Sequence, residues 1–416
     1  EYAGQGWRML MECLSTGRAI SLPAIGTTSI KQTLRTTSAY ARVRRQFGIP
    51  VGLMEGVAEP LGEMVKRAYM YEAARRLTAS MVDEGQRPAV IAGLLKYTTT
   101  EAMRDSMDEA FDIQGGRAIQ DGPKNYLFGG YMAIPVAITV EGANILTRTL
   151  MTFAQGVLRA HPYLLSEIQA AQNKDKKAGL EAFDVAFGGH TKFMLRNIAA
   201  TFLHGVSNGA FASSPNDGPM AKWYRRLHRY SQDFALVADW TTVVLGGALK
   251  RKQKLSGRMA DLLGELYLMS ATLKRFDEEG RIKEDQELVD AIMEDRVANL
   301  ERIFGEIFAN FPNPFFANAM RFLCFPLGRH AKPSSDRVNY RFVRAVLKPG
   351  AFRDRLTTGV YVSTDPNDIT GVLEDAFVKV TEAEEIEAKF IKASRKGVFE
   401  RRLDRDAIAD AVAAEA

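Results

Sequence analysis

The 416-residue chain contains few cysteines and histidines. Its two cysteines, Cys13 and Cys324, are far apart and have no nearby set of metal ligands, so the sequence predicts no disulfide framework, no zinc site and a reducing compartment. None of the histidines shows metal-ligand spacing, and each is interpreted as a capping or surface residue: His161, His190, His204, His228 and His330.

The sequence also lacks a long hydrophobic run. No uncharged stretch reaches the roughly 18 to 20 residues needed to cross a bilayer, so we expect no transmembrane helix.

The first six residues, Glu1 to Gly6, include neither an initiator Met nor the basic region of a signal peptide. We therefore expect the chain to be the C-terminal part of a longer polypeptide.

The charge pattern disfavours one class of partner. The net charge is +5, and acidic residues are interspersed almost as densely as basic ones, which disfavours binding to nucleic acid. With 46% apolar and 25% charged residues, the composition is that of an ordinary globular protein.

Strand-like alternation is absent, and helical periodicity recurs along most of the chain, so the predicted fold is all-α. An amphipathic stretch near the N-terminus is expected to end at Gly17 and Arg18. Longer helices are expected over 24–46, 52–83, 88–113, 141–159, 225–249, 255–278 and 286–310, and charged tail helices over 382–392 and 401–414. Loops are expected over 120–131 and 210–219, and the proline-broken aromatic run 310–316 is not expected to form a regular helix.

These elements predict a four-helix bundle, a second helical bundle and a helical tail. The expected division is an N-terminal segment with a first helix, a four-helix bundle, a connector, a second bundle and a tail, at 1–22, 23–160, 161–220, 221–330 and 331–416.

Glu141 is the first candidate functional residue. Seven uncharged residues, 134–140, precede this carboxylate, and Gly142 follows it, where the missing side chain lets another molecule approach the backbone. A desolvated carboxylate is costly unless it is neutral, paired or used. Its position is equally consistent with an acid at the start of a helix, where the helix dipole favours an anion. Spacing alone leaves both interpretations open.

Three segments, in order, resemble the C-terminal helical domain of acyl-CoA dehydrogenases. They are Tyr40-Ala41-Arg42-Val43-Arg44-Arg45-Gln46-Phe47-Gly48, then Asp112-Ile113-Gln114-Gly115-Gly116, then Glu141-Gly142. The long extension after them is most similar to bacterial FadE-type enzymes of fatty-acid β-oxidation. The resemblance implies an FAD-dependent enzyme that converts fatty acyl-CoA to trans-2-enoyl-CoA and passes electrons to electron-transfer flavoprotein.

The resemblance also assigns roles at the reacting end of the substrate. Glu141 is implied to be the base that removes the α-proton, and Gly142 to leave space for the substrate thioester and the flavin ring. In some relatives the base comes instead from the position matching Gly17, before Arg18. A glycine cannot serve as a base, so Glu141 is the sole candidate.

Flavin contacts are implied for a second set of residues. Arg44 is implied to reach the FAD pyrophosphate of a neighbouring subunit. Gln46 is implied to add a hydrogen bond and Phe47 a packing contact. At Gly115 and Gly116, backbone without side chains is implied to meet the adenosine half of FAD. The competing interpretation of the arginines is a solvated helix face. The chain departs from the family at Asp112, where Gln is usual, at Ala143, where Thr is usual, and in lacking an arginine–aspartate pair ahead of Glu141.

Other functions stay open at this point. An acyl-CoA oxidase would use the same base and transfer electrons to oxygen, whereas a non-catalytic helical assembly or membrane-docking subunit would need no base. The family's N-terminal helical domain and β-domain have no counterpart here. The resemblance therefore implies that residues 1–22 contain the exit from a missing β-domain, and we expect an incomplete active site in this chain alone. We expect a homodimer or higher homo-oligomer in the cytoplasm. The basic clusters 222–226 and 250–254 suit either solvated helix ends or peripheral contact with an anionic inner membrane.

Overall fold

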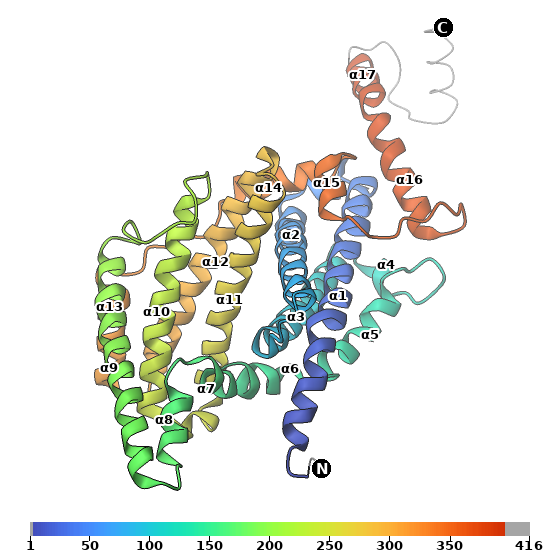
Figure 1. Ribbon diagram of the computed structural model, residues 1–416. Coiled ribbons are helices and arrows are strands. Elements are labelled where there is room, and N and C mark those ends of the chain that lie inside the picture. The colour runs from blue at the N-terminus through green and yellow to red at the C-terminus, as the bar shows by residue number, and fades with distance from the viewer. Residues whose placement is uncertain (1–2, 396–416) are drawn as a thin grey trace.

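The computed structural model describes residues 3–395, which form an almost entirely helical molecule (Figure 1). Its N-terminal part comprises α1 (Gly6–Val43), α2 (Glu55–Asp83), α3 (Ala89–Gln114), α4 (Gly116–Ile119), α5 (Phe128–Thr139), α6 (Asn144–Leu146), the π-helical η2 (Thr147–Gln155) and α7 (Gly156–Ala160). A two-residue antiparallel strand pair, β1 (Arg45–Gln46) and β2 (Ile49–Pro50), and the short 3-10 helix η1 (Val51–Leu53) connect α1 to α2.

The C-terminal part continues as helices. These are α8 (Leu164–Ala171), α9 (Lys176–Val206), α10 (Ala221–Leu245), η3 (Gly246–Lys250), α11 (Gln253–Glu278), α12 (Lys283–Asn310), α13 (Pro314–Cys324), α14 (Asp336–Val346), α15 (Ala351–Leu356), α16 (Ile369–Glu382) and α17 (Glu384–Arg395). The all-α prediction is confirmed. The expected helix over 401–414 lies outside the described residues.

Helix α1 is longer than the sequence pattern indicated. It continues through Gly17 and Pro23, so the predicted end at Gly17 and Arg18 is wrong. Helices α2 and α3 both pack along α1. This tertiary packing outweighs the weak local tendency of Gly17 and Pro23 to end a helix. At Gly26 the contact with α3 is so close that a Cβ atom would lie 2.5 Å from the side chain of Thr99.

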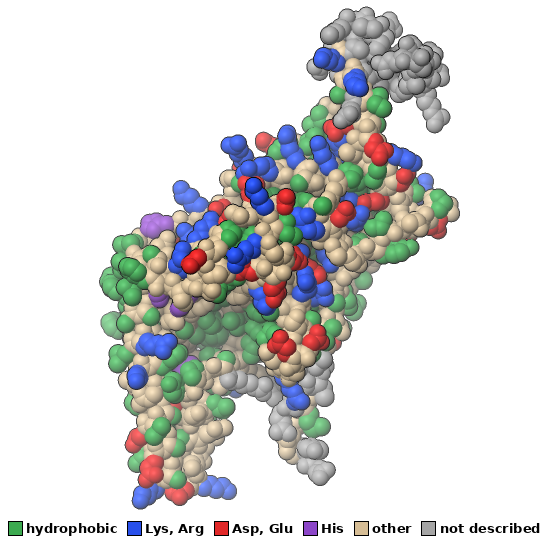
Figure 2. Space-filling view, turned by 45° about the horizontal axis from the view of Figure 1, so that its top comes forward, with side chains coloured by type: hydrophobic (Ala, Val, Ile, Leu, Met, Phe, Trp, Pro, Cys, Tyr) green, Lys and Arg blue, Asp and Glu red, His purple; other side chains and the backbone are tan. Residues whose placement is uncertain are grey.

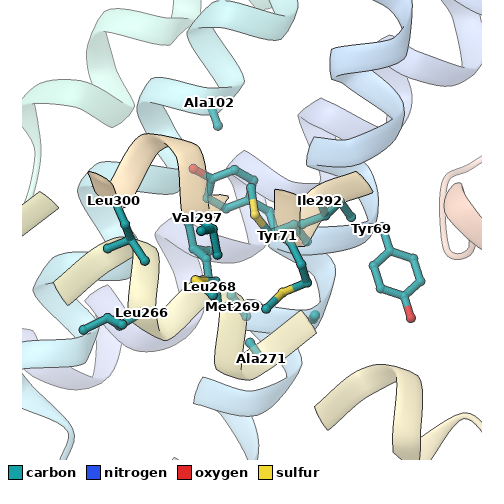
Figure 3. Close-up of a cluster of buried hydrophobic side chains, with 14 of the residues drawn as sticks. Tyr69, Tyr71, Ala102, Leu266, Leu268, Met269, Ala271, Ile292, Val297 and Leu300 are labelled. Carbon is teal, nitrogen blue, oxygen red and sulfur yellow. The ribbon is translucent and has the colours of Figure 1, made fainter. Parts of the chain in front are cut away.

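The two helical parts share one apolar core. Helix α11 packs against α2 and η2 on one side and against α10 and α12 on the other. Figure 3 shows the centre of this contact, where side chains from α2, α3, α11 and α12 meet; the labelled ones are Tyr69, Tyr71, Ala102, Leu266, Leu268, Met269, Ala271, Ile292, Val297 and Leu300. The division of the chain at 160 and 220 stays a prediction.

Two other expectations about local structure are wrong. The expected loop 120–131 already contains the start of α5 at Phe128. The segment 161–220, for which no helix was specified, contains the 31-residue helix α9. The aromatic run after residue 310 leads into α13, because Asn313 caps the helix by accepting hydrogen bonds from the backbone nitrogens of Phe315 and Phe316.

Candidate active site

Glu141 lies in a turn between α5 and α6. The expected helix over 141–159 begins only at Asn144, so Glu141 does not start a helix. Its φ angle is 54°, and that of Gly142 is 100°. The left-handed conformation is unfavourable for a residue with a side chain, so neighbouring groups must hold Glu141 there.

The Glu141 side chain lies against α1. A Cβ atom at Gly17 would be 2.8 Å from its Oε1, so the carboxylate occupies the space that a side chain at Gly17 would fill. The other carboxylate oxygen, Oε2, is buried and accepts no hydrogen bond from the described residues. A buried acceptor without a partner is costly, and this one is therefore a candidate for contact with a reacting group.

Arg18 holds the backbone of the same turn. Its Nε donates a hydrogen bond of 2.5 Å to the carbonyl oxygen of Glu141, and its side chain is buried. Burial lowers the pKa of the Arg18 guanidinium, and the negative charge of Glu141 opposes this shift. Gly142 lies next to Arg18, and a Cβ there would be 3.3 Å from the guanidinium and 3.2 Å from Oγ1 of Thr147. The turn itself therefore requires glycine at 142.

Lys96 of α3 supports the turn from the opposite side. Its fully buried ammonium donates hydrogen bonds to the carbonyl oxygens of Ile138 and Gly142, each at 3.0 Å, and to Oδ1 of Asn144 at 2.7 Å. Burial, and then repulsion by Arg18, lowers the pKa of Lys96 to about 8. Sequence analysis missed this residue, although Lys96 is the only charged residue between Ala89 and Thr100.

Asn144 extends these contacts along α3. Its Nδ2 donates to Oγ1 of Thr100 at 2.9 Å and to Oε1 of Glu101 at 2.7 Å. Asn144 therefore connects the first residue of α6 to two successive residues of α3. Together with Lys96 it fixes where the chain leaves the Glu141 turn.

The apolar run before Glu141 does not enclose the carboxylate. Within 134–140 only Ile134 and Ala137 are buried, whereas Val136 and Val140 are 61% and 40% exposed. The contacts around Glu141 come instead from α1 and α3, whose residues are more than 40 positions away in sequence. The expectation that this run desolvates Glu141 is therefore wrong.

The arginine-rich motif forms the end of α1 and the hairpin after it. Arg44 caps α1, Gln46 ends β1, and Phe47 and Gly48 form the turn with φ angles of 52° and 79°. Positive φ at both central residues suits the twist of a two-residue hairpin. Arg44 and Gln46 are exposed, and Phe47 is 95% exposed. These side chains are free to contact another molecule.

The diglycine follows α3. Gly115 has φ 60° and ψ −140°, and no atom lies within 4 Å of a Cβ built at Gly115 or Gly116. The next residue, Arg117, lies over the rings of Tyr40 and Tyr126 at 5.8 Å and 4.7 Å. The C-terminal ends of α1 and α3 therefore lie side by side and bring the diglycine near the Arg44 hairpin.

The structure separates the two sets of predicted residues. Glu141 contacts α1 at Gly17 and Arg18, whereas the hairpin and diglycine lie at the other end of α1, near Tyr40. The 22 residues from Arg18 to Tyr40 span about 33 Å of helix at a rise of about 1.5 Å per residue. Asp112, the departure in the second motif, is exposed.

The basic cluster 222–226 contacts α12 through Asp290, and peripheral membrane contact stays a prediction. Trp223 is buried, and its indole nitrogen donates to Asp290 at 2.5 Å. Lys222 pairs with the same carboxylate at 2.8 Å, and both Lys222 and Arg226 lie over the Trp223 ring. Among residues 3–395, no helix is long and apolar enough to cross a membrane.

A buried polar cluster joins α8, α9 and α10. His190, which was expected at a cap or on the surface, is buried; its Nδ1 lies 2.7 Å from Glu167 and its Nε2 2.8 Å from Asp239. Two carboxylates flank the ring, an arrangement that favours the doubly protonated imidazolium form. His161 does act as a cap, since its Nδ1 accepts hydrogen bonds from the backbone nitrogens of Tyr163 and Leu164. One ligand atom each of His161, His190 and Asp239 lies within 4.8 Å of the others, so the fold brings together side chains whose sequence spacing gave no metal signal.

Opposing effects set the pKa values in this cluster. Burial alone would lower the pKa of His190, but hydrogen bonds with Asp239 and Glu167 outweigh it and raise the pKa above the ordinary value. Burial alone would raise the pKa of Asp239, but the hydrogen bond with His190 and the nearby ring nitrogen of His161, 3.5 Å away, hold it below its ordinary value.

The raised pKa of His190 predicts a pH-dependent stability. Its contribution is fully present below the unfolded-state pKa of about 6.5 and is lost as pH rises through the higher folded-state pKa. We expect the difference in free energy of unfolding between the unmodified chain and His190→Gln to be largest near pH 6 and to shrink towards pH 9, measured by urea denaturation. His330→Gln, at an exposed histidine, is the control. A difference independent of pH would contradict this assignment.

Comparisons with known proteins identify the family. Residues 4–153 match the family described as acyl-CoA dehydrogenase, C-terminal domain, and residues 158–416 match acyl-CoA dehydrogenase, C-terminal, bacterial type. The probable acyl-CoA dehydrogenase FadE10 of Mycobacterium tuberculosis is 26% identical over 323 residues, which are 74% of this chain and 48% of that protein. The chain thus spans about half the length of the curated relatives it matches.

Solved structures show the same fold. An acyl-CoA dehydrogenase from Bacillus anthracis, complexed with FAD, matches 82% of this chain and 56% of its own at 17% identity, with a TM-score of 0.62. Acyl-CoA oxidase-1 from Caenorhabditis elegans, complexed with FAD and ATP, matches 97% of this chain and 57% of its own at 15% identity, with a TM-score of 0.53. Taken with the two family matches, these findings show that the chain belongs to the acyl-CoA dehydrogenase family.

Proposed function

We propose that this chain supplies the catalytic base and part of the flavin site of an FAD-dependent enzyme that oxidises fatty acyl-CoA to trans-2-enoyl-CoA in the first step of β-oxidation. The observation that carries the proposal is the placement of Glu141. Its carboxylate is held on a left-handed turn, packed against a glycine of α1, with one buried oxygen that accepts no hydrogen bond from the described residues. Such an oxygen is available to accept a proton.

The reaction needs a base and a hydride acceptor. Glu141 takes the proton from the α-carbon and becomes a neutral carboxylic acid, while bound FAD supplies the oxidant for the β-hydride. Arg18 and Lys96 do not touch the substrate in this scheme. They are positioning residues, because they hold the backbone carbonyls of Glu141 and Gly142. Gly142 leaves the thioester side of the turn without a side chain.

The flavin contacts are proposed at the other end of α1. The exposed guanidinium of Arg44 suits a pyrophosphate, with Gln46 and Phe47 beside it, and the open backbone at Gly115 and Gly116 suits the adenosine half. Because about 33 Å of helix separates this end from Glu141, we propose that Arg44 serves the FAD of a neighbouring subunit in a homodimer or larger homo-oligomer. We propose electron-transfer flavoprotein as the electron acceptor.

Glu141→Gln should lower kcat of the flavin-loaded enzyme by about 10²- to 10⁴-fold, because the amide cannot take the α-proton. Flavin absorbance and acyl-CoA binding should be retained. Asp121→Asn, in the exposed loop before α5, is the matched control and should be active. Unchanged turnover in Glu141→Gln would refute the base assignment. Peroxide formation by the unmodified enzyme without an added acceptor would instead indicate an oxidase.

Gly17→Ala tests the position of the carboxylate without removing it. The added methyl would lie 2.8 Å from Oε1 of Glu141, so the side chain must move. A displacement of about 1 Å in a catalytic group can cost about 10²-fold, and we expect a loss of kcat of that order with retained flavin. Gly56→Ala, where no atom lies within 4 Å of the new Cβ, is the control. Full activity in Gly17→Ala would contradict this geometry.

Subunit mixing tests whether Glu141 and Arg44 serve different flavins. Glu141→Gln and Arg44→Glu should each be inactive alone. A heterodimer that carries one substitution on each subunit, isolated with two affinity tags, should recover about half of the wild-type turnover per dimer, because one of its two sites is intact. If both residues served the same flavin, each site would carry one defect and no activity would return.

A further inference from the structure

Helix α9 exposes apolar side chains and buries small or polar ones. An amphipathic surface helix normally buries its apolar face. The buried residues of α9 are instead small or polar: Gly179, Ala186, His190, Asn197, Thr201, His204 and Gly205. Four large apolar side chains, Phe183, Phe193, Met194 and Ile198, are half-buried. The others are exposed: Leu180, Val185, Phe187, Leu195, Phe202, Leu203 and Val206.

The exposed apolar residues form a stripe. Leu180, Phe187, Leu195, Phe202 and Val206 follow one another at separations of seven, eight, seven and four residues, which places them along one face of the helix. Figure 2 shows hydrophobic side chains exposed on the side of the molecule where Figure 1 places α9 and α13. A contiguous exposed apolar surface of this kind marks an interaction site.

Four of the five stripe residues are symmetric about Thr191, and the fifth, Val206, would lie opposite Lys176. Leu180 and Phe202 lie eleven residues before and after it, and Phe187 and Leu195 lie four residues before and after it. An antiparallel copy of α9 related by a two-fold axis at Thr191 would therefore place Leu180 against Phe202 and Phe187 against Leu195. Gly188, near the crossing point, has no atom within 4 Å of a built Cβ, so the two backbones can approach closely.

The charged residues of α9 favour the same antiparallel arrangement. Between Leu180 and Val206 the carboxylates, Glu181 and Asp184, lie in the N-terminal half, and the lysine and arginine, Lys192 and Arg196, lie in the C-terminal half; all four are exposed. An antiparallel copy brings Glu181 and Asp184 towards Lys192 and Arg196 of the other copy, whereas a parallel copy would align like charges.

We propose that the exposed face of α9 is a two-fold, antiparallel contact with a second copy of this chain, centred on Thr191. Such an isologous contact uses one self-complementary surface on both subunits. Helix α9 packs against α8, α10 and α13, whereas the Arg44 hairpin belongs to the α1 bundle. The α9 contact is therefore separate from the proposed sharing of flavin and does not depend on it.

Cysteine cross-linking tests the register. Thr191→Cys should form disulfide-linked dimers under mild oxidation, beyond any formed by the unmodified chain with its native cysteines. Phe187→Cys and Leu195→Cys should cross-link when the two variants are mixed and not when each is alone. In the proposed register two copies of residue 187 are about 12 Å apart along the axis, beyond the roughly 7 Å that a disulfide can bridge. Efficient cross-linking of each variant with itself, or none at Thr191→Cys, would overturn the proposal.

Sedimentation of a charged variant tests the stripe itself. Phe187→Glu should weaken self-association at least about tenfold while helical content is unchanged, and Ala182→Glu, exposed and off the stripe, should not. Arg44→Glu should leave the Thr191→Cys cross-link intact. If the chain stays monomeric and Phe187→Glu instead abolishes binding to vesicles of about one-third phosphatidylglycerol in phosphatidylcholine, lipid is the occupant and the proposal fails. It also fails if the cross-link forms in this chain and disappears in a longer chain that includes the expected N-terminal helical domain and β-domain.

Discussion

The buried ammonium of Lys96 is the interaction on which the candidate site depends. A cation removed from water is costly unless strong acceptors replace its hydration, and here two backbone carbonyls and one side-chain amide oxygen do so. Those acceptors lie on both sides of Glu141. The same ammonium therefore ends α5, holds Gly142 and fixes the start of α6. With Arg18 on the other side, it compensates for the unfavourable backbone conformation of Glu141.

Helix α1 sets the distance between Glu141, the proposed base, and Arg44, the proposed contact with the FAD pyrophosphate. Its N-terminal half provides the glycine and the arginine that enclose Glu141, and its C-terminal end carries Arg44. A continuous helix is a rigid spacer, and α1 has no break at Pro23. The separation of base and pyrophosphate contact is therefore a property of this helix, and it makes assembly of subunits part of the proposed active site.

Sequence reasoning succeeded where one periodic pattern decided the outcome. The helices at 55–83, 89–114 and 253–278 were predicted to within three residues at each end because their apolar spacing and end signals agree. It failed where contacts between segments distant in sequence determine the structure. From the sequence alone Gly17 indicates the end of a helix, whereas in the structure it lies inside α1 with Glu141 packed against it. The partners of His190 are on two other helices, at Glu167 and Asp239, and no local pattern indicates them.

Helix α9 was missed for a related reason. Periodicity identifies the apolar face of a helix without indicating which side is inside, and here the buried side is polar. Apolar side chains can slide past one another at little cost, whereas His190 between Glu167 and Asp239 can pair in only one register. We infer that the hydrogen bonds of His190 with Glu167 and Asp239 fix the position of α9 against α8 and α10. The apolar side chains, not needed to place the helix, are then left on the outside for assembly.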